Sequence, residues 1–92
     1  MAVIVTVEIP GVTEEQYEEL MRQLGGTDWF PADGLIAHAA GPDGEGGWKV
    51  VDFWDSEDQF LAFVERARPI MERAGISSML PTVQQAVNVV LR

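Results

Sequence analysis

Residues 35–54 have the sequence LIAHAAGPDGEGGWKVVDFW, and this stretch decides which fold the chain can adopt. Leu35–Ala40 is a short apolar segment, and Trp48–Trp54 is rich in the β-branched and aromatic residues that strands favour. The segment Gly41–Gly47 between them is rich in glycine. Two strand-like segments joined by such a turn predict a β-hairpin.

A strand and a helix are predicted before the hairpin. Residues 2–9 are AVIVTVEI, and both alternating faces begin apolar, so we expect a central strand that is covered on both sides. Thr13 and Gln16 have the spacing of a helix-capping box. Apolar side chains then recur at helical spacing over residues 17–24, and Gly25-Gly26 should end this helix.

A second helix and a last strand are predicted after the hairpin. Ser56 and Gln59 repeat the capping-box spacing at the start of the longest helical pattern. Pro69 lacks a backbone N–H and clashes with the preceding turn, so we expect a kink or break near residues 65–68, with a second short helical piece beyond. Thr82–Leu91 is predicted to be the final strand.

The predicted order of elements is β-α-β-β-α-β. With right-handed crossovers this order leads to an α+β fold, in which two helices cover one face of a four-stranded antiparallel sheet. This is the ferredoxin-like arrangement. We expect a single domain over residues 1–92.

The sheet face that the helices leave uncovered should also be apolar. We assign to it Ile4, Thr6, Ala37, Ala39, Val51, Phe53, Ala86 and Val90. An exposed apolar face of this kind is typical of an interaction surface. We therefore expect a homodimer in which two sheets pack face to face as a barrel. The alternative is a monomer with a mildly apolar face.

Composition and charge exclude several classes of function. The chain has six basic and fifteen acidic side chains, for a formal charge of −9. Nucleic acid and anionic membrane surfaces are therefore unexpected partners, because both are bound through clustered Lys and Arg. With no cysteine and one histidine, we expect no disulfide, no thiol nucleophile and no dedicated metal site. No signal peptide or membrane span is evident, so we expect a cytoplasmic protein.

One face of the hairpin combines apolar and polar side chains. If the turn centres near Gly44, position 38 lies opposite position 50. Side-chain alternation then places Ile36, His38, Ala40, Trp48, Val50, Asp52 and Trp54 on the same face. A slip of one residue would separate His38 from the tryptophans.

His38 and Asp52 are the candidate catalytic residues. A neutral imidazole can act as a general base near neutral pH. A carboxylate within an apolar strand needs a partner, and Asp52 has His38, Lys49 or an arginine of the second helix as candidates. A His38–Asp52 pair could orient the imidazole for proton transfer, or it could be a structural hydrogen bond. Both interpretations remain open at this stage.

The aromatic side chains are candidate substrate-binding residues. Trp48 and Trp54 could form a wall for a planar ligand, and Trp29 and Phe30 lie in a loop that could close one end of the pocket. Phe63 belongs to the apolar stripe of the second helix. The alternative is that these side chains fill the core.

The residues around the hairpin resemble a known family. The stretch Gly47–Ser56, followed by Phe60 and Phe63, is similar to the strand-to-helix signature of the dimeric α+β barrel superfamily, and within it of the antibiotic biosynthesis monooxygenase-like domains. The shared pattern is an apolar strand that ends in Trp, then an acid, a capping Ser and a Phe. The resemblance covers essentially the whole chain. It implies a dimer with a pocket between sheet and helices in each subunit, lined by Trp54.

The resemblance implies several activities, and departures from the family pattern narrow them. Haem-degrading members use an Asn in the first strand and a His in the second helix, and both are missing here. Quinone-forming monooxygenases pair the Trp with an Asn four residues earlier, where this chain has Val50. The polar pair would instead be His38 and Asp52. The resemblance thus implies a cofactor-free monooxygenase, or a cyclase or isomerase, acting on a small aromatic or polyketide-like substrate.

Two other functions stay open. The chain could form a non-catalytic dimer that binds a small apolar ligand, or an accessory dimer whose pocket is filled by its own Trp and Phe side chains. A cavity of about 300 Å³ or more beside Trp54, with His38 and Asp52 in its wall, would favour a ligand site.

Overall fold

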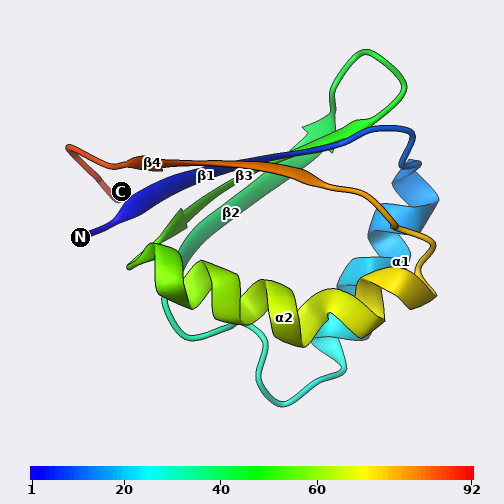
Figure 1. Cartoon of the computed structure of the whole chain (residues 1–92), viewed down its shortest axis with the longest axis horizontal. Helices are drawn as coiled ribbons and strands as arrows, with labels where there is room; N and C mark the ends of the chain where they lie inside the picture. The colour runs from blue at the N-terminus through cyan, green and yellow to red at the C-terminus, as the bar shows by residue number, and fades with distance from the viewer.

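Six elements in the order β-α-β-β-α-β form the structure, a computed structural model that describes residues 1–92. They are β1 (Val3–Ile9), α1 (Glu14–Gly25), β2 (Leu35–Pro42), β3 (Trp48–Trp54), α2 (Glu57–Arg73) and β4 (Leu80–Gln85). The strands make one antiparallel sheet in the order β2-β3-β1-β4. Both helices lie on the same side of it (Figure 1). The predicted ferredoxin-like fold is confirmed.

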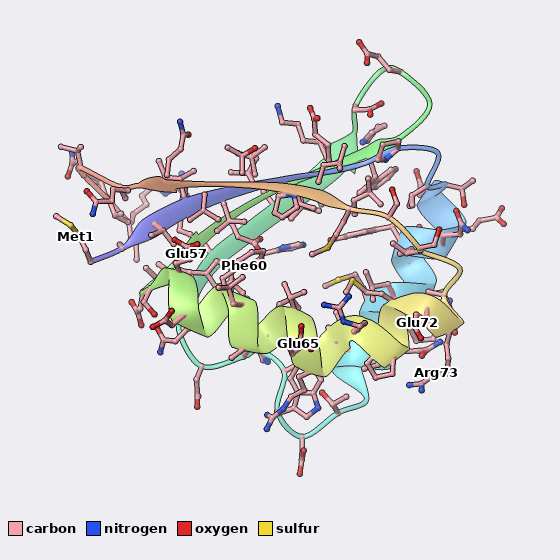
Figure 2. All side chains as sticks on the ribbon, in the orientation of Figure 1. Met1, Glu57, Phe60, Glu65, Glu72 and Arg73 are labelled. Atoms are coloured by element: carbon pink, nitrogen blue, oxygen red, sulfur yellow. The ribbon has the colours of Figure 1, made fainter.

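The core lies between the sheet and the two helices. β1 is a central strand, as predicted, and its side chains at positions 3, 5, 7 and 9 are buried. Its other face is not covered by this chain, because Ile4 and Thr6 are only partly buried and Glu8 is exposed. Val5 and Trp54 are both fully buried on the helix-facing side. Phe60 points from α2 toward the sheet (Figure 2) and is 2% exposed. Apolar alternation in the strands and the apolar stripes of the helices therefore meet in one layer.

The predicted helix caps are present. Thr13 accepts a hydrogen bond from the backbone N–H of Gln16, and the Gln16 side chain accepts one from the backbone N–H of Thr13. The hydroxyl of Ser56 accepts from the backbone N–H of Gln59 in the same way at the start of α2. These bonds satisfy amide groups that have no partner within the helix. Neither helix has the length and hydropathy that crossing a bilayer requires.

α2 continues through Pro69 without a break, so the prediction of two helical pieces is wrong. The missing N–H of Pro69 would have bonded the carbonyl of Glu65, which is an exposed residue that water can reach. Ala67 and Ile70, on either side of the proline, are buried in the core. Their packing offsets the roughly 3 kcal/mol that a proline inside a helix costs.

β4 ends at Gln85 rather than at Leu91, which corrects the predicted last strand. β4 pairs only with β1, and Gln85 lies opposite Val3, where β1 begins. The N–H of Ala86 donates one more hydrogen bond to the carbonyl of Ala2, at 2.9 Å. Past this point the chain finds no strand to pair with, and Val87 is 99% exposed.

The register of the hairpin differs from the predicted one. His38 lies opposite Asp52 rather than opposite Val50, because the turn centres one residue later than Gly44. The Asp43 carboxylate causes this shift by accepting hydrogen bonds from the backbone N–H groups of Glu45 and Gly47. An aspartate side chain that accepts hydrogen bonds from the backbone N–H groups of the residues that follow it stabilises a turn at its own position.

β2 also contains an irregularity that changes which side chain faces the helices. Leu35 pairs with Trp54 and Ala37 with Phe53, so Ile36 has no partner in β3. Such an extra residue is a β-bulge, and it reverses the alternation on one side of it. Leu35, rather than Ile36 as predicted, packs against the core.

The sheet face opposite the helices keeps most of its predicted apolar set. Across β1, β3 and β2 it carries Ile4, Thr6, Val51, Phe53, Ala37 and Ala39, joined by the cross-strand register. The assignment of Ala86 and Val90 to this face is wrong, because both lie beyond β4. Thr82 and Gln84 of β4 border the face instead. No element of this chain covers it (Figure 1).

Candidate functional site

His38 and Asp52 meet across the hairpin. As directly opposed residues of β2 and β3 they project to the same side of the sheet, where Nδ1 of His38 lies 2.6 Å from Oδ1 of Asp52. Asp52 is 5% exposed, whereas the His38 side chain is 26% exposed. A carboxylate only accepts, so His38 donates its Nδ1–H to Asp52. This bond sets the tautomer and leaves Nε2 as the acceptor of a neutral imidazole.

Trp54 holds the other oxygen of the same carboxylate. Its indole N–H donates to Oδ2 of Asp52 at 3.1 Å. The two residues are two positions apart in β3, so their side chains leave the strand on the same face. Both carboxylate oxygens of Asp52 therefore have a donor, which is what a buried carboxylate requires.

Tyr17 completes the arrangement from the helix side. Its hydroxyl lies 2.5 Å from Nε2 of His38 and is the donor of this bond. The ring of Tyr17 stacks on that of Trp48, with centroids 5.2 Å apart and planes at 28°. Burial raises the pKa of the Tyr17 hydroxyl above its usual 10, and the negative charge of Asp52 raises it further.

The Tyr17 hydroxyl was missed at the level of sequence. Tyr17 sits on the apolar stripe of α1, and core packing accounts for it fully there. The available signal was that it is the only tyrosine of the chain and lies on a helix face turned toward the hairpin. A buried tyrosine hydroxyl usually has a hydrogen-bond partner.

These polar groups lie in the wall of an apolar cavity between the sheet and the helices. Sixteen of its eighteen lining residues are hydrophobic, and the other two are His38 and Asp52. The cavity leaves about 70 Å³ for water-sized molecules. This is smaller than the ~300 Å³ of a typical ligand site. Met21, Met71 and Met79 line it, and methionine side chains repack readily.

The predicted substrate-binding residues divide into two groups. Trp54, Phe30 and Phe63 line the cavity. Trp48 does not, because it is buried behind Tyr17 as a support for its ring. Trp29 also stays outside: it packs edge-on against Phe30 and Phe63, with the Arg66 guanidinium 5.3 Å from its centroid.

A second hollow opens on the surface beside this aromatic cluster. It has a volume of about 540 Å³ and lies between the loop at residues 28–33 and the first half of α2. Trp29 lines it, and Phe63 lines both this hollow and the inner cavity. The ring of Phe63 therefore separates the surface hollow from the cavity that holds His38 and Asp52.

The structure has no group of three or more His, Cys, Asp or Glu side chains placed to hold a metal ion. The polar groups of the cavity wall are suited to moving protons, because a carboxylate, an imidazole and a phenol are joined in sequence.

The fold is shared with several solved structures. SnoaB, a cofactor-independent oxygenase from Streptomyces nogalater, is 10% identical, with a TM-score of 0.62 over 99% of this chain and 97% of that one. A dimeric ferredoxin-like protein from an uncultured marine organism is 15% identical, with a TM-score of 0.65 over 99% and 92%. The chain has the fold of these proteins. A monooxygenase from the ActVA-Orf6 gene of Streptomyces coelicolor, in complex with nanaomycin D, is 14% identical, with a TM-score of 0.65 over 99% and 92%.

This likeness agrees with the fold that the resemblance of the sequence implies. At such identities it establishes the fold and leaves the chemistry to the site. The sequence matches no protein-family model and no curated protein.

Proposed function

We propose that the protein is a cofactor-independent acid–base enzyme that removes a proton from a hydroxyl group of a small aromatic substrate. The observation that carries the proposal is the His38–Asp52 pair in the wall of an otherwise apolar cavity. Asp52 fixes the imidazole and balances the positive charge that it would gain. An apolar wall with one polar end suits a flat aromatic molecule that carries a hydroxyl.

The most specific form of the proposal is a monooxygenase. A phenolate is electron-rich enough to react with molecular oxygen. Phenol and O₂ give a quinone and water, so that no further reductant is needed. Two proteins that share the fold are an oxygenase and a monooxygenase, and this supports the same reaction class. A cyclase or isomerase would use the same deprotonation without oxygen.

Oxygen uptake with a panel of phenols and naphthols tests the proposal. We expect the wild type to consume oxygen and form a quinone absorbance band with at least one of them. His38→Gln and Asp52→Asn should each lower kcat by about 100-fold, the usual contribution of a positioned acid or base. Glu45→Gln, at an exposed position in the turn of the same hairpin, is the control and should keep full activity. Equal rates in the wild type and His38→Gln would refute the acid–base role.

A ligand-binding protein without turnover is the second candidate. The hydrogen bonds of His38 favour it, because both ring nitrogens already have partners and neither is free to act as a base in this structure. A ligand of naphthol size, like a substrate, can enter the cavity only when Phe63 or the methionines move. In that case naphthols would bind without oxygen uptake. His38→Gln would then weaken their affinity, and no product would form.

We also propose that the protein is a homodimer through the uncovered sheet face. The face is apolar at its centre, where Phe53 lies between Ile4 and Ala37. The dimeric ferredoxin-like protein that shares the fold supports the same assembly. Packing two such faces would remove a contiguous apolar surface from water.

A further inference from the structure

The hydrogen bonds of the candidate site form one unbroken chain. Trp54 donates to Asp52, His38 donates to the second oxygen of Asp52, and Tyr17 donates to His38. Each ring nitrogen of His38 and each oxygen of Asp52 is used once. The imidazole therefore has no free nitrogen with which to take a proton from a substrate.

Tyr17 is the end of this hydrogen-bond chain that can still bind a further group. Its hydroxyl uses its only hydrogen on His38, which leaves oxygen lone pairs free to accept. Tyr17 is also a lining residue of the cavity. A substrate hydroxyl at the polar end of the cavity can thus donate to the Tyr17 oxygen without breaking any bond of the chain.

The surroundings of Tyr17 hold it in this place. Its ring stacks on Trp48, and it lies nearly parallel to the His38 ring, with an angle of 4° and centroids 6.2 Å apart. Trp48 is 7% exposed, so the surface behind Tyr17 is itself fixed by the core. A reacting group that is held in this way loses little entropy when it meets its substrate.

We propose that Tyr17 is the catalytic residue that contacts the substrate and that it relays the proton to His38. The step rests on the proposed function. The O–H bond of the substrate breaks and leaves its electron pair on the phenolate oxygen. That proton joins the Tyr17 oxygen while the proton of Tyr17 passes to Nε2 of His38. The product is a phenolate opposite an imidazolium, which Asp52 stabilises.

The alternative in which Tyr17 acts as a standing tyrosinate base is disfavoured. Burial and the charge of Asp52 both raise the pKa of its hydroxyl, so the resting group is neutral near pH 7. In a relay the tyrosine never carries a full negative charge, because it gains one proton as it loses the other. The relay also names the substrate class: an aromatic molecule with one hydroxyl at the polar end and apolar edges elsewhere.

Tyr17→Phe tests the relay, because it keeps the ring on Trp48 and removes only the hydroxyl. With the phenol that gives the fastest oxygen uptake, we expect kcat to fall about 100-fold and KM to change less than threefold. A plot of kcat against the fraction of D₂O in the solvent should be curved for the wild type, where two protons move together. The same plot should be linear for the variant. Glu18→Gln, at an exposed position next to Tyr17 on α1 and outside the cavity, is the control and should keep both the rate and the curved plot.

Binding of para-nitrophenol gives a readout that needs no turnover. Its anion absorbs in the visible, so the wild type should convert bound probe to the anion at a pH where free probe is largely neutral. Tyr17→Phe should bind it in the neutral form. The ¹⁵N signal of Nε2 in the single histidine should report loss of its hydrogen-bond donor in the variant.

The outcomes separate the relay from the proposed function. An active wild type with an equally active or faster Tyr17→Phe variant would overturn the relay and leave His38 as the direct base. A wild type that neither turns over any phenol nor forms the para-nitrophenol anion would overturn the proposed function, and the relay with it.

Discussion

Trp54 and Asp52 are hydrogen-bonded neighbours on one face of β3, with the indole N–H 3.1 Å from the carboxylate. This bond fixes the rotation of the carboxylate, and so it aims the other oxygen at His38. Trp54 is fully buried, so the donor cannot move away. The strand-end tryptophan therefore has two roles: it lines the cavity and orients the group on which the imidazole depends.

Trp54→Phe should destabilise the protein by about 1–3 kcal/mol, the cost of leaving a buried acceptor without its donor. It should also lower the rate of oxygen uptake, because Asp52 would lose its orientation. Urea unfolding measures the first effect. Trp29→Phe is the matched control: this half-buried indole lies outside the cavity, and its replacement should cost much less. Equal losses in the two variants would contradict the role of the hydrogen bond.

Tyr17 should titrate above pH 10 in the folded protein. Burial is the larger cause of its raised pKa and Asp52 is the smaller. His38 and Asp52 are the titratable groups joined to it through the hydrogen-bond chain. Asp52→Asn should therefore lower the pKa partway and leave it above 10. The tyrosinate absorbance near 295 nm reports this one residue, because the chain has a single tyrosine.

The same shift predicts how stability depends on pH. A raised pKa in the folded state means that the folded protein holds the proton more tightly than the unfolded chain. The contribution of Tyr17 is thus complete below about pH 10 and is lost as the pH rises through the folded-state pKa. Tyr17→Phe should remove this part of the alkaline loss. Urea midpoints between pH 9 and pH 11 measure it, and parallel curves for both proteins would contradict it.

Pro69→Ala should stabilise the protein by about 1–2 kcal/mol. The alanine restores an N–H that can bond the Glu65 carbonyl, and this gain exceeds the entropy that the unfolded chain recovers on losing a proline. The control is Pro81→Ala in the edge strand β4, where only the unfolded-state effect applies and a small loss is expected. Thermal unfolding compares the two. A loss at both positions would show that Pro69 fits the helix without cost.

The faces of the strands could be predicted from the sequence because side-chain alternation is unaffected by a register error of an even number of residues. The predicted register of the hairpin was off by two residues, yet His38 and Asp52 were placed on the correct face, since an even shift preserves the face. The direct pairing of the two residues depended on the turn that Asp43 closes, and no periodic pattern encodes that turn.

The interior of the site was less predictable. The cavity is small because of how Phe30, Phe63 and three methionines pack. The rotamers that determine this packing cannot be inferred from the spacing of residues in the sequence. The contact between Tyr17 and His38 joins α1 to β2, two elements whose relative position is set by the packing of the whole core.

Phe53→Lys should disrupt the proposed homodimer and give a monomer. Phe53 lies at the centre of the uncovered sheet face, opposite Ile4 and Ala37, and a buried ammonium there would have no partner. We expect the Kd of the dimer to rise at least about tenfold, which corresponds to 1.4 kcal/mol. Size-exclusion chromatography with light scattering measures this change. Leu61→Lys, which places the same charge at an exposed position on α2, should leave the dimer intact. A wild type that is monomeric at every concentration would contradict the proposed interface.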